Sequence, residues 1–153
     1  MELQDRIKQL EQENSRLRML LADSVSEPVT RAADIARTFI PKLATEQQEC
    51  FYALYLDSNH EIIDELMISK GTLTSSLVHP REVYAPALER RAARMIVLHN
   101  HPSRNTEPSQ QDIDITKRLF EAGLILGIDL LDHIIIGGKS FYSFADTGRM
   151  PVK

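Results

Sequence analysis

The sequence predicts an α+β domain that follows a long amino-terminal helix. Hydrophobic residues recur at intervals of four and three over residues 1–23, which is the spacing of a helix. Further along, short apolar runs of strand length alternate with segments of helical periodicity. With 153 residues and 42% hydrophobic content, the chain can bury one core of ordinary size. A single globular domain with one appendage is therefore expected.

The appendage, residues 1–23, has the heptad pattern of a coiled coil. Its a and d positions are occupied by Leu3, Ile7, Leu10, Asn14, Leu17 and Leu21. An asparagine at an a position pairs with its own copy across a parallel two-stranded coil and disfavours other registers. Arg6 at g would face Glu11 at e of a second chain, and the same pairing of opposite charges recurs one heptad later. We expect a parallel homodimer through residues 1–23, with a helix docked on its own domain as the alternative.

The elements of the domain are expected after a linker at 24–27, so that the domain spans 28–153. Pro28 stands where a first helical position would be, and the pattern predicts a helix over 29–40 that ends at Pro41. Further helices are expected over 80–93 and 109–126. The expected strands are 51–56, 61–68, 95–99, 130–136 and 141–144, the first two joined as a hairpin.

Composition narrows the classes of function. The net charge of −4 gives no general attraction to nucleic acid, which is therefore not an expected partner. The tightest basic cluster, at Arg90, Arg91 and Arg94, shares a predicted helix with acidic residues and is interpreted as a solvated face. A single cysteine excludes an intrachain disulfide and a zinc site of several thiolates. No segment has the length of a membrane span or a signal peptide, so a cytoplasmic protein that does not contact membranes is expected.

Residues with metal-binding chemistry concentrate in one short segment. His99 and His101 lie two residues apart at the end of a predicted strand, so their imidazoles share a face. The next helix starts with Ser109 as N-cap and Asp112 at the third helical position, where a carboxylate also stabilises the helix end by itself. This helix start can return one carboxylate to two imidazoles. Two nitrogens and one oxygen would fill three tetrahedral positions of zinc and leave the fourth to water, which is typical of catalytic sites.

The same segment resembles the signature of a known family. His99-x-His101-Pro102, followed after six residues by Ser109-x-x-Asp112, is similar to the motif of the JAMM (JAB, MPN-plus) metalloproteases. The segments that resemble the bacterial RadC-type branch are Gly71-Thr72-Leu73, Val78-His79-Pro80-Arg81-Glu82-Val83, His99-Asn100-His101-Pro102-Ser103 and Leu131-Asp132-His133-Ile134-Ile135-Ile136. The resemblance spans roughly residues 28 to 148. It implies the JAMM/MPN-like, cytidine-deaminase-like fold, a mixed and curved β-sheet flanked by helices.

The resemblance also implies an activity. Zn2+ would be held by His99, His101 and Asp112, and a zinc-bound water activated by a glutamate would hydrolyse amide or isopeptide bonds of a peptide or protein substrate. A hydroxyl at Ser109 that pointed into the site could donate a hydrogen bond to the oxyanion of the reaction.

An upstream glutamate would act as general acid and base in this reaction. In the family it lies on the strand before the Gly-Thr segment, which makes Glu65 the best match here. Asp64 or Glu61 are the alternatives, because a β-bulge could shift the register by one residue.

Two departures from the RadC-type pattern affect these expectations. Arg104 stands where a glycine usually follows Pro-Ser, which is costly if that position needs a positive φ, and Asn105 could take that conformation instead. A coiled coil stands where the branch commonly carries helix-hairpin-helix elements, so a DNA-related role taken from that region has no support. Asp132 and His133 are interpreted either as residues that orient a metal ligand or as ordinary residues at a strand end, and are left out of the metal shell.

A catalytically silent, dimeric binding module in a RadC-type, DNA-repair-related protein is the alternative function. A metal-dependent phosphoesterase or nuclease is a weaker third reading, because one zinc ion and no basic groove serve phosphodiesters poorly.

Overall fold

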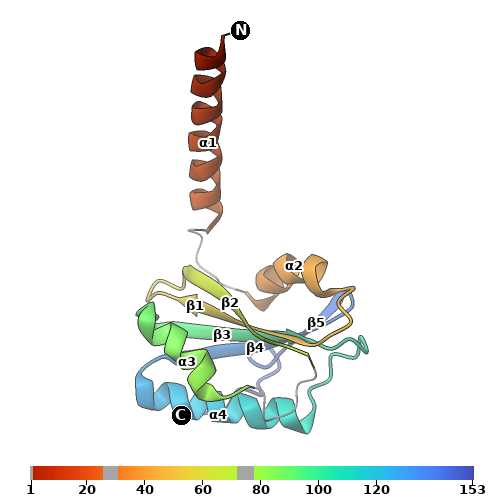
Figure 1. The fold of residues 1–153 in the computed structure, drawn as a ribbon. Coiled ribbons are helices and arrows are strands. Elements are labelled where there is room, and N and C mark those ends of the chain that lie inside the picture. The colour runs from red at the N-terminus through yellow and green to blue at the C-terminus, as the bar shows by residue number, and fades with distance from the viewer. Residues whose placement is uncertain (1, 26–30, 72–77) are drawn as a thin grey trace.

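The domain is built on one five-stranded β-sheet of order β2-β1-β3-β4-β5 (Figure 1). The computed structural model describes residues 2–25, 31–71 and 78–153. The strands are β1 (Cys50–Leu56), β2 (Ile62–Lys70), β3 (Arg94–Asn100), β4 (Asp129–Gly137) and β5 (Ser140–Ser143). β3 and β4 are parallel, and the other neighbouring pairs are antiparallel. The predicted mixed α+β class is confirmed, and each predicted strand lies within two residues of an observed one at both ends.

Helices lie on both faces of the sheet (Figure 1). The helices of the described residues are α1 (Leu3–Val25), α2 (Ala32–Leu43), α3 (Pro80–Glu89) and α4 (Gln110–Leu126). α2 packs on one face, whereas α3 and α4 pack on the other. α4 forms the crossover between β3 and β4. Parallel strands need a long connection of this type, because a short turn cannot join them.

The amino-terminal helix α1 stands apart from the other elements (Figure 1), and residues 2–20 are all exposed. It continues to Val25, beyond the predicted coil and through the first half of the predicted linker, while Pro28 and linker residues 26 and 27 fall outside the described residues. In the part of the chain that the structure describes, no helix combines the length and the apolarity needed to cross a membrane.

The sheet separates two hydrophobic cores, and this separation decides which side chains reach the site. Phe51 and Ala53 of β1 belong to the core beneath α3 and α4, whereas the alternate residues Cys50 and Leu54 belong to the core beneath α2. β1 runs antiparallel to β3 with Phe51 opposite His99. The beginning of β1 therefore lies beside the end of β3, and His99 projects to the side of α3 and α4.

The second helix differs from its prediction, because Pro41 lies inside α2 and does not end it. Proline removes one helical hydrogen bond, but it keeps a φ that a helix accepts. Phe39 and Leu43 are both buried against the sheet, at 2% and 4% exposure. Their burial stabilises the last turn, so the helix continues to Leu43.

The third helix is shorter than predicted, because α3 ends at Glu89 and the backbone of Arg91 is left-handed, with φ 52°. The three arginines therefore do not share one helix, since Arg94 begins β3. Arg90 is not part of a solvated face either. Its guanidinium donates to Asp64 at 2.7 Å and lies over the ring of Tyr55.

We predict that Gly123→Ala destabilises the domain although alanine favours helices by about 1 kcal/mol. A Cβ at this position of α4 would lie 2.3 Å from the backbone oxygen of Ile128 and 2.6 Å from the hydroxyl of Tyr84. Overpacking of this kind costs about 1–3 kcal/mol. Urea unfolding should show a net loss of stability, while the control Glu121→Ala on the exposed side of the same helix should stay within about 0.5 kcal/mol of the parent. Equal stability of both variants would contradict this packing.

Candidate metal centre

Three side chains converge where β3 ends and α4 begins. His99 Nε2 lies 3.0 Å from His101 Nε2 and 3.2 Å from Asp112 Oδ1, and His101 Nε2 lies 3.0 Å from Asp112 Oδ2. Within residues 2–25, 31–71 and 78–153, this is the one group of three or more His, Cys, Asp or Glu side chains whose ligand atoms come close enough to share a metal ion. The structure thus brings together the three residues that the sequence suggests as ligands.

The donor atoms of this cluster fit a zinc ion. Ligands at about 2.0–2.1 Å from a tetrahedral centre are about 3.3 Å apart, close to the separations between the three donors. The set of two imidazole nitrogens and one carboxylate is among those that zinc uses in hydrolases. His99 and Asp112 are 1% and 7% exposed, so water competes weakly for these positions.

The second nitrogen of each imidazole is also engaged, as expected for metal-binding histidines. His101 Nδ1 lies 2.7 Å from the backbone oxygen of Asn105, which can only accept, so this nitrogen donates and Nε2 is the nitrogen available to a metal ion. His99 Nδ1 lies 2.8 Å from Nε2 of His133, a fully buried residue of β4. Both rings therefore have a fixed orientation with Nε2 directed into the cluster.

The predicted start of α4 is confirmed, and it positions the carboxylate. Ser109 is the N-cap, its hydroxyl accepts from the backbone nitrogen of Asp112 at 3.1 Å, and its own backbone nitrogen donates to Asp112 Oδ2 at 2.9 Å. This is a complete capping box. Asp112 therefore stabilises the helix end and faces the imidazoles at the same time, so the two interpretations of this residue are compatible.

The electrostatics of the cluster favour a positive charge among the three side chains. Burial alone would raise the pKa of Asp112, but hydrogen bonds from His101 and His99 hold it well below its usual value. Burial lowers the pKa of His101, but its hydrogen bonds to Asp112 and Asn105, together with the negative charges of Asp112 and Glu49, leave it raised. The same negative charges would stabilise a metal cation in this place.

The loop between the second histidine and α4 contains the departure from the RadC-type pattern. Arg104 itself adopts the left-handed conformation, with φ 68°, so the expectation that Asn105 would do so instead is wrong. The turn is held by a hydrogen bond from Arg104 N to His101 O and by close packing on β4. A Cβ on Gly137 would come within 2.8 Å of the backbone oxygen of Arg104. An arginine thus occupies the position where the family usually has glycine. The loop still places the backbone oxygen of Asn105 within hydrogen-bonding distance of His101 Nδ1.

Glu65, the predicted acid and base, lies on the wrong face of the sheet. It is opposite Leu54, which belongs to the core beneath α2. Side chains opposite one another in an antiparallel pair share a face, so Glu65 also lies on the α2 side. Its carboxylate pairs with Lys42 of α2 at 3.3 Å. The sheet therefore separates Glu65 from His99, and the prediction for Glu65 is corrected.

The two alternatives to Glu65 do not reach the cluster either. Asp64 is on the correct side, but it lies opposite Tyr55, about 13 Å along β1 from Phe51, and is bound to Arg90. Glu61 precedes β2 at the opposite end of the sheet from His99.

A different glutamate, Glu49, is the one whose charge acts on the cluster. It immediately precedes β1 and is two residues from Phe51, which lies opposite His99. Its charge is among the causes of the raised pKa of His101. Sequence reasoning missed Glu49 because it compared only the strand before the Gly-Thr segment. The available signal was a glutamate at the start of a buried strand, but the pairing of that strand with β3 was unknown.

Asn100 holds the backbone on both sides of Glu49. Its side-chain oxygen accepts from Cys50 N at 2.7 Å, and its side-chain nitrogen donates to Gln48 O at 3.0 Å. The backbone oxygen of Glu49 itself accepts from Gly71 N at 2.9 Å. The residue between the two histidines thus ties the strand that bears them to the segment that bears the glutamate.

Asp132 and His133 have different roles: Asp132 is an ordinary structural residue, whereas His133 contacts a candidate metal ligand. Asp132 caps a turn, because its carboxylate accepts from Ser143 Oγ at 2.6 Å and from Ala145 N at 3.0 Å. His133 lies inside β4 and contacts His99 directly. Neither residue belongs to the group of three that could hold the ion.

This fold and this cluster define a domain of the JAB class, and the sequence comparisons name its branch. The RadC-like JAB domain family matches residues 29–149. A UPF0758 protein of Staphylococcus aureus (strain NCTC 8325) is 49% identical over 120 residues, which cover 78% of this chain and 55% of that protein. A UPF0758 protein of Clostridioides difficile (strain 630) is 48% identical over 113 residues, 74% of this chain and 48% of that protein. The chain belongs to the RadC-like JAB domain family, and it spans about half the length of the curated relatives it matches.

We predict that the purified protein binds one zinc ion per chain and that Asp112→Asn loses it. The amide keeps the shape of the side chain but removes its charge, and zinc prefers the carboxylate. Asp114→Asn is the matched control, because Asp114 is on the same helix and bonds only to Gln110 in the described structure. Metal analysis after gel filtration should find zinc in the parent and in Asp114→Asn. Retention of zinc by Asp112→Asn would contradict the assignment.

Zinc affinity should fall as the pH is lowered. A proton and a metal ion compete for Nε2 of His101, whose pKa is raised, so the proton competes from a higher pH than at an ordinary histidine. Below that pKa, each displaced proton lowers the apparent affinity about tenfold per pH unit. Chelator competition between about pH 8 and pH 6 measures this change. An affinity that does not vary over that range would show that His101 is not a ligand.

Proposed function

We propose that this chain is a zinc-dependent hydrolase of amide or isopeptide bonds in a peptide or protein substrate. The observation that carries the proposal is the convergence of His99, His101 and Asp112 within 3.2 Å of one another, with each histidine held at its other nitrogen. Membership of the JAB family, which includes metalloproteases, supports the same conclusion. When bound, zinc acts as a Lewis acid and makes a coordinated water acidic enough to react near neutral pH.

Glu49 is proposed as the residue that moves the proton, in place of Glu65. A general base must lie on the same side of the sheet as the reacting atoms and within reach of them. Two observations support Glu49 in this role: it is two residues before Phe51, which lies opposite His99, and its charge contributes to the raised pKa of His101. Its carboxylate would accept a proton from the attacking water and deliver it to the leaving amine. The clamp by Asn100 limits the movement of the backbone that carries it.

Ser109 is proposed to stabilise the developing oxyanion. Its hydroxyl uses an oxygen lone pair to cap α4, so its proton is available to another acceptor. Ser109 is exposed and directly bonded to Asp112, which places the hydroxyl at the solvent side of the cluster. A hydrogen-bond donor in that place would act on the charge that forms on the scissile carbonyl.

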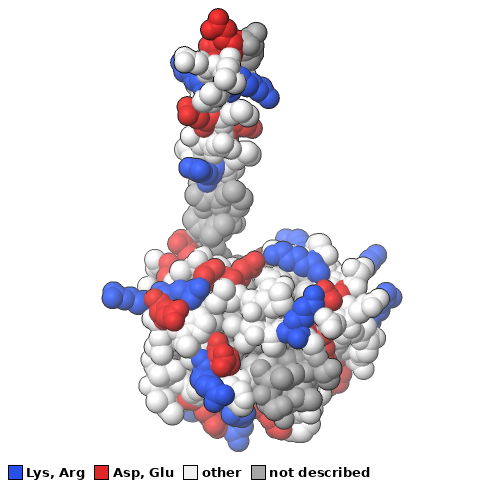
Figure 2. All heavy atoms as spheres, viewed as in Figure 1, with Lys and Arg blue, Asp and Glu red and all other residues white. Residues whose placement is uncertain are grey.

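The alternative function, a silent binding module, is less well supported than the hydrolase. A module without turnover needs no set of zinc ligands, and all three candidate ligands are present here and lie close enough to share an ion. A role on nucleic acid has less support, because the face seen in Figure 2 carries Lys and Arg interspersed with Asp and Glu rather than a basic groove.

The proposal is tested by Glu49→Gln and Glu65→Gln on a peptide library. Loss of a general base lowers the rate roughly a hundredfold to ten-thousandfold, and this loss is expected for Glu49→Gln alone. Glu65→Gln is the matched control, because it makes the same chemical change on the opposite face. Both variants should retain zinc, since neither residue belongs to the cluster of three. A zinc-loaded parent that cleaves no peptide would favour the silent module, and equal cleavage by both variants would remove Glu49 from its role.

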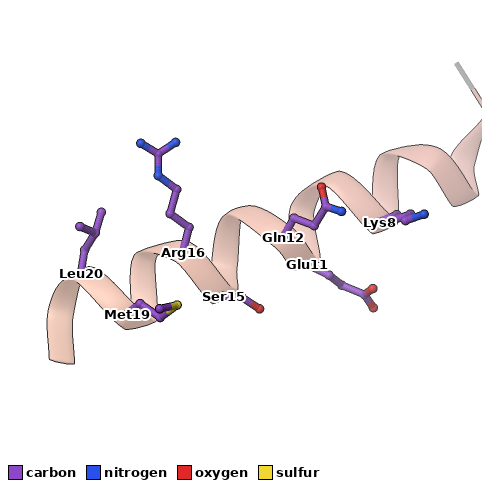
Figure 3. A pocket seen from close by; sticks show the side chains of 7 residues that line it. All are labelled: Lys8, Glu11, Gln12, Ser15, Arg16, Met19 and Leu20. Atoms are coloured by element: carbon purple, nitrogen blue, oxygen red, sulfur yellow. The ribbon is translucent and has the colours of Figure 1, made fainter. Parts of the chain in front are cut away.

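We further propose that the working form is a parallel homodimer joined through α1. Side chains of its a and d seam are exposed, with Leu10 at 49% and Leu17 at 46%, which is unusual for leucine unless a partner covers it. The charges at e and g are complementary between two copies, and Asn14 favours the two-stranded parallel form. The hollow in Figure 3 lies on another face of the helix, since the residues that line it, which include Gln12 and Met19, are outside the seam.

We predict that the double variant Leu10→Glu, Leu17→Glu is a monomer. It introduces repelling charges at two d positions, which would face their own copies in the dimer. Gln12→Glu with Met19→Glu is the matched control, because it adds the same acidic side chains on the outer face. Analytical ultracentrifugation should find the parent and the control as dimers. A dimeric seam variant would assign the interface to another surface.

A further inference from the structure

A chain of four hydrogen-bonding groups connects two of the proposed metal ligands through the interior of the domain. His99 Nδ1 lies 2.8 Å from His133 Nε2, and His133 Nδ1 lies 2.6 Å from Thr116 Oγ1. Thr116 Oγ1 in turn lies 2.6 Å from the backbone oxygen of Asp112. The chain therefore begins at a ligand in β3, passes through β4, and returns to a ligand in α4.

The direction of every bond in this chain follows from its last acceptor. A carbonyl oxygen has no proton, so Thr116 must donate to Asp112 O. The hydroxyl has only one proton, so it must accept from His133, whose Nδ1 is then protonated. His133 is fully buried, and its two ring nitrogens contact Thr116 and His99 rather than a carboxylate, so the ring is neutral and its Nε2 is an acceptor. His99 Nδ1 must then be the donor, which leaves His99 Nε2 as the nitrogen that can bind a metal ion.

The surroundings of His133 hold the ring in this orientation. The residue is 0% exposed, its ring stacks on Phe144 with an interplanar angle of 12°, and Phe51 contacts it edge-on. Thr116 is 1% exposed, so water does not replace either partner. An incorrectly protonated ring would leave a buried donor facing a donor, which is unfavourable because neither group then has an acceptor.

We propose that Thr116 and His133 are positioning residues that fix the tautomer of His99, so that its Nε2 is deprotonated and directed at the metal. This inference rests on the proposed metal site, but not on hydrolysis. Neither residue belongs to the group that could hold the ion, and neither is assigned a part in the reaction. In this arrangement the interior of the domain, and not solvent, determines which nitrogen of His99 can bind.

The experiment compares Thr116→Val with Thr116→Ser. Valine has nearly the shape of threonine but no hydroxyl, so the proton on His133 Nδ1 loses its acceptor and the opposite tautomers of His133 and His99 become favoured. Serine keeps the hydroxyl. We expect Thr116→Val to bind zinc tenfold to a hundredfold more weakly than the parent in chelator competition, and Thr116→Ser to bind within about threefold of it. Equal zinc affinities for Thr116→Val and the parent would overturn the proposal.

A second readout uses metal-free protein with ¹⁵N-labelled histidine and is independent of both zinc and turnover. Long-range ¹H–¹⁵N spectra should show the proton of His99 on Nδ1 in the parent and in Thr116→Ser, and on Nε2 in Thr116→Val. A parent with the proton on Nε2 of His99 would overturn the inference even if the protein binds zinc and cleaves peptides. If the spectra are as expected but the protein cleaves no peptide, the tautomer inference holds and only the proposed hydrolase function fails.

Discussion

The structure depends on one electrostatic constraint, which is that three electron-rich groups meet at the end of β3. Two imidazole nitrogens and a carboxylate lie within 3.2 Å of one another in a largely buried place. Without a metal ion, the buried carboxylate is compensated by hydrogen bonds from the two histidines and from Ser109 N, and its charge would equally stabilise a cation between the three groups. The capping box, the turn at Arg104 and the buried chain from His99 to Thr116 all hold these groups together, so the local structure around them is organised for a positive ion.

The sheet determines which side chains face the candidate metal site. Alternation along β1 and β3 directs one set of side chains to α2 and the other to the cluster. Glu65 lies on the side of α2, whereas Glu49 is two residues before Phe51, which lies opposite His99. The H-x-H spacing has the same effect. The two histidines point into the cluster, while Asn100 between them contacts the backbone on both sides of Glu49.

The sequence allowed the fold class, the strands, the start of α4 and the three proposed ligands to be predicted, because each depends on local patterns. Periodicity marks strands, and Ser109 with Asp112 is a local capping signal. The errors arose where long-range packing decides. Pro41 stays in α2 because the sheet covers its last turn, and Arg104 takes a positive φ because β4 packs against its loop. The register of β1 against β2 puts Glu65 on the side of α2, and the register of β1 against β3 puts Phe51, two residues after Glu49, opposite His99. The partners of His133 were equally hidden, since Thr116 comes from a helix that only the fold brings to β4.

The central claim is that one zinc ion occupies the space between His99, His101 and Asp112 with a coordination position left for substrate or water. Crystals of the protein purified with zinc, measured on both sides of the zinc absorption edge, test this claim most directly. A single anomalous peak about 2.0–2.2 Å from the two Nε2 atoms and the carboxylate, with no fourth protein ligand, is the result expected. A peak elsewhere in the chain, or a fourth side chain closing the coordination sphere, would contradict the account.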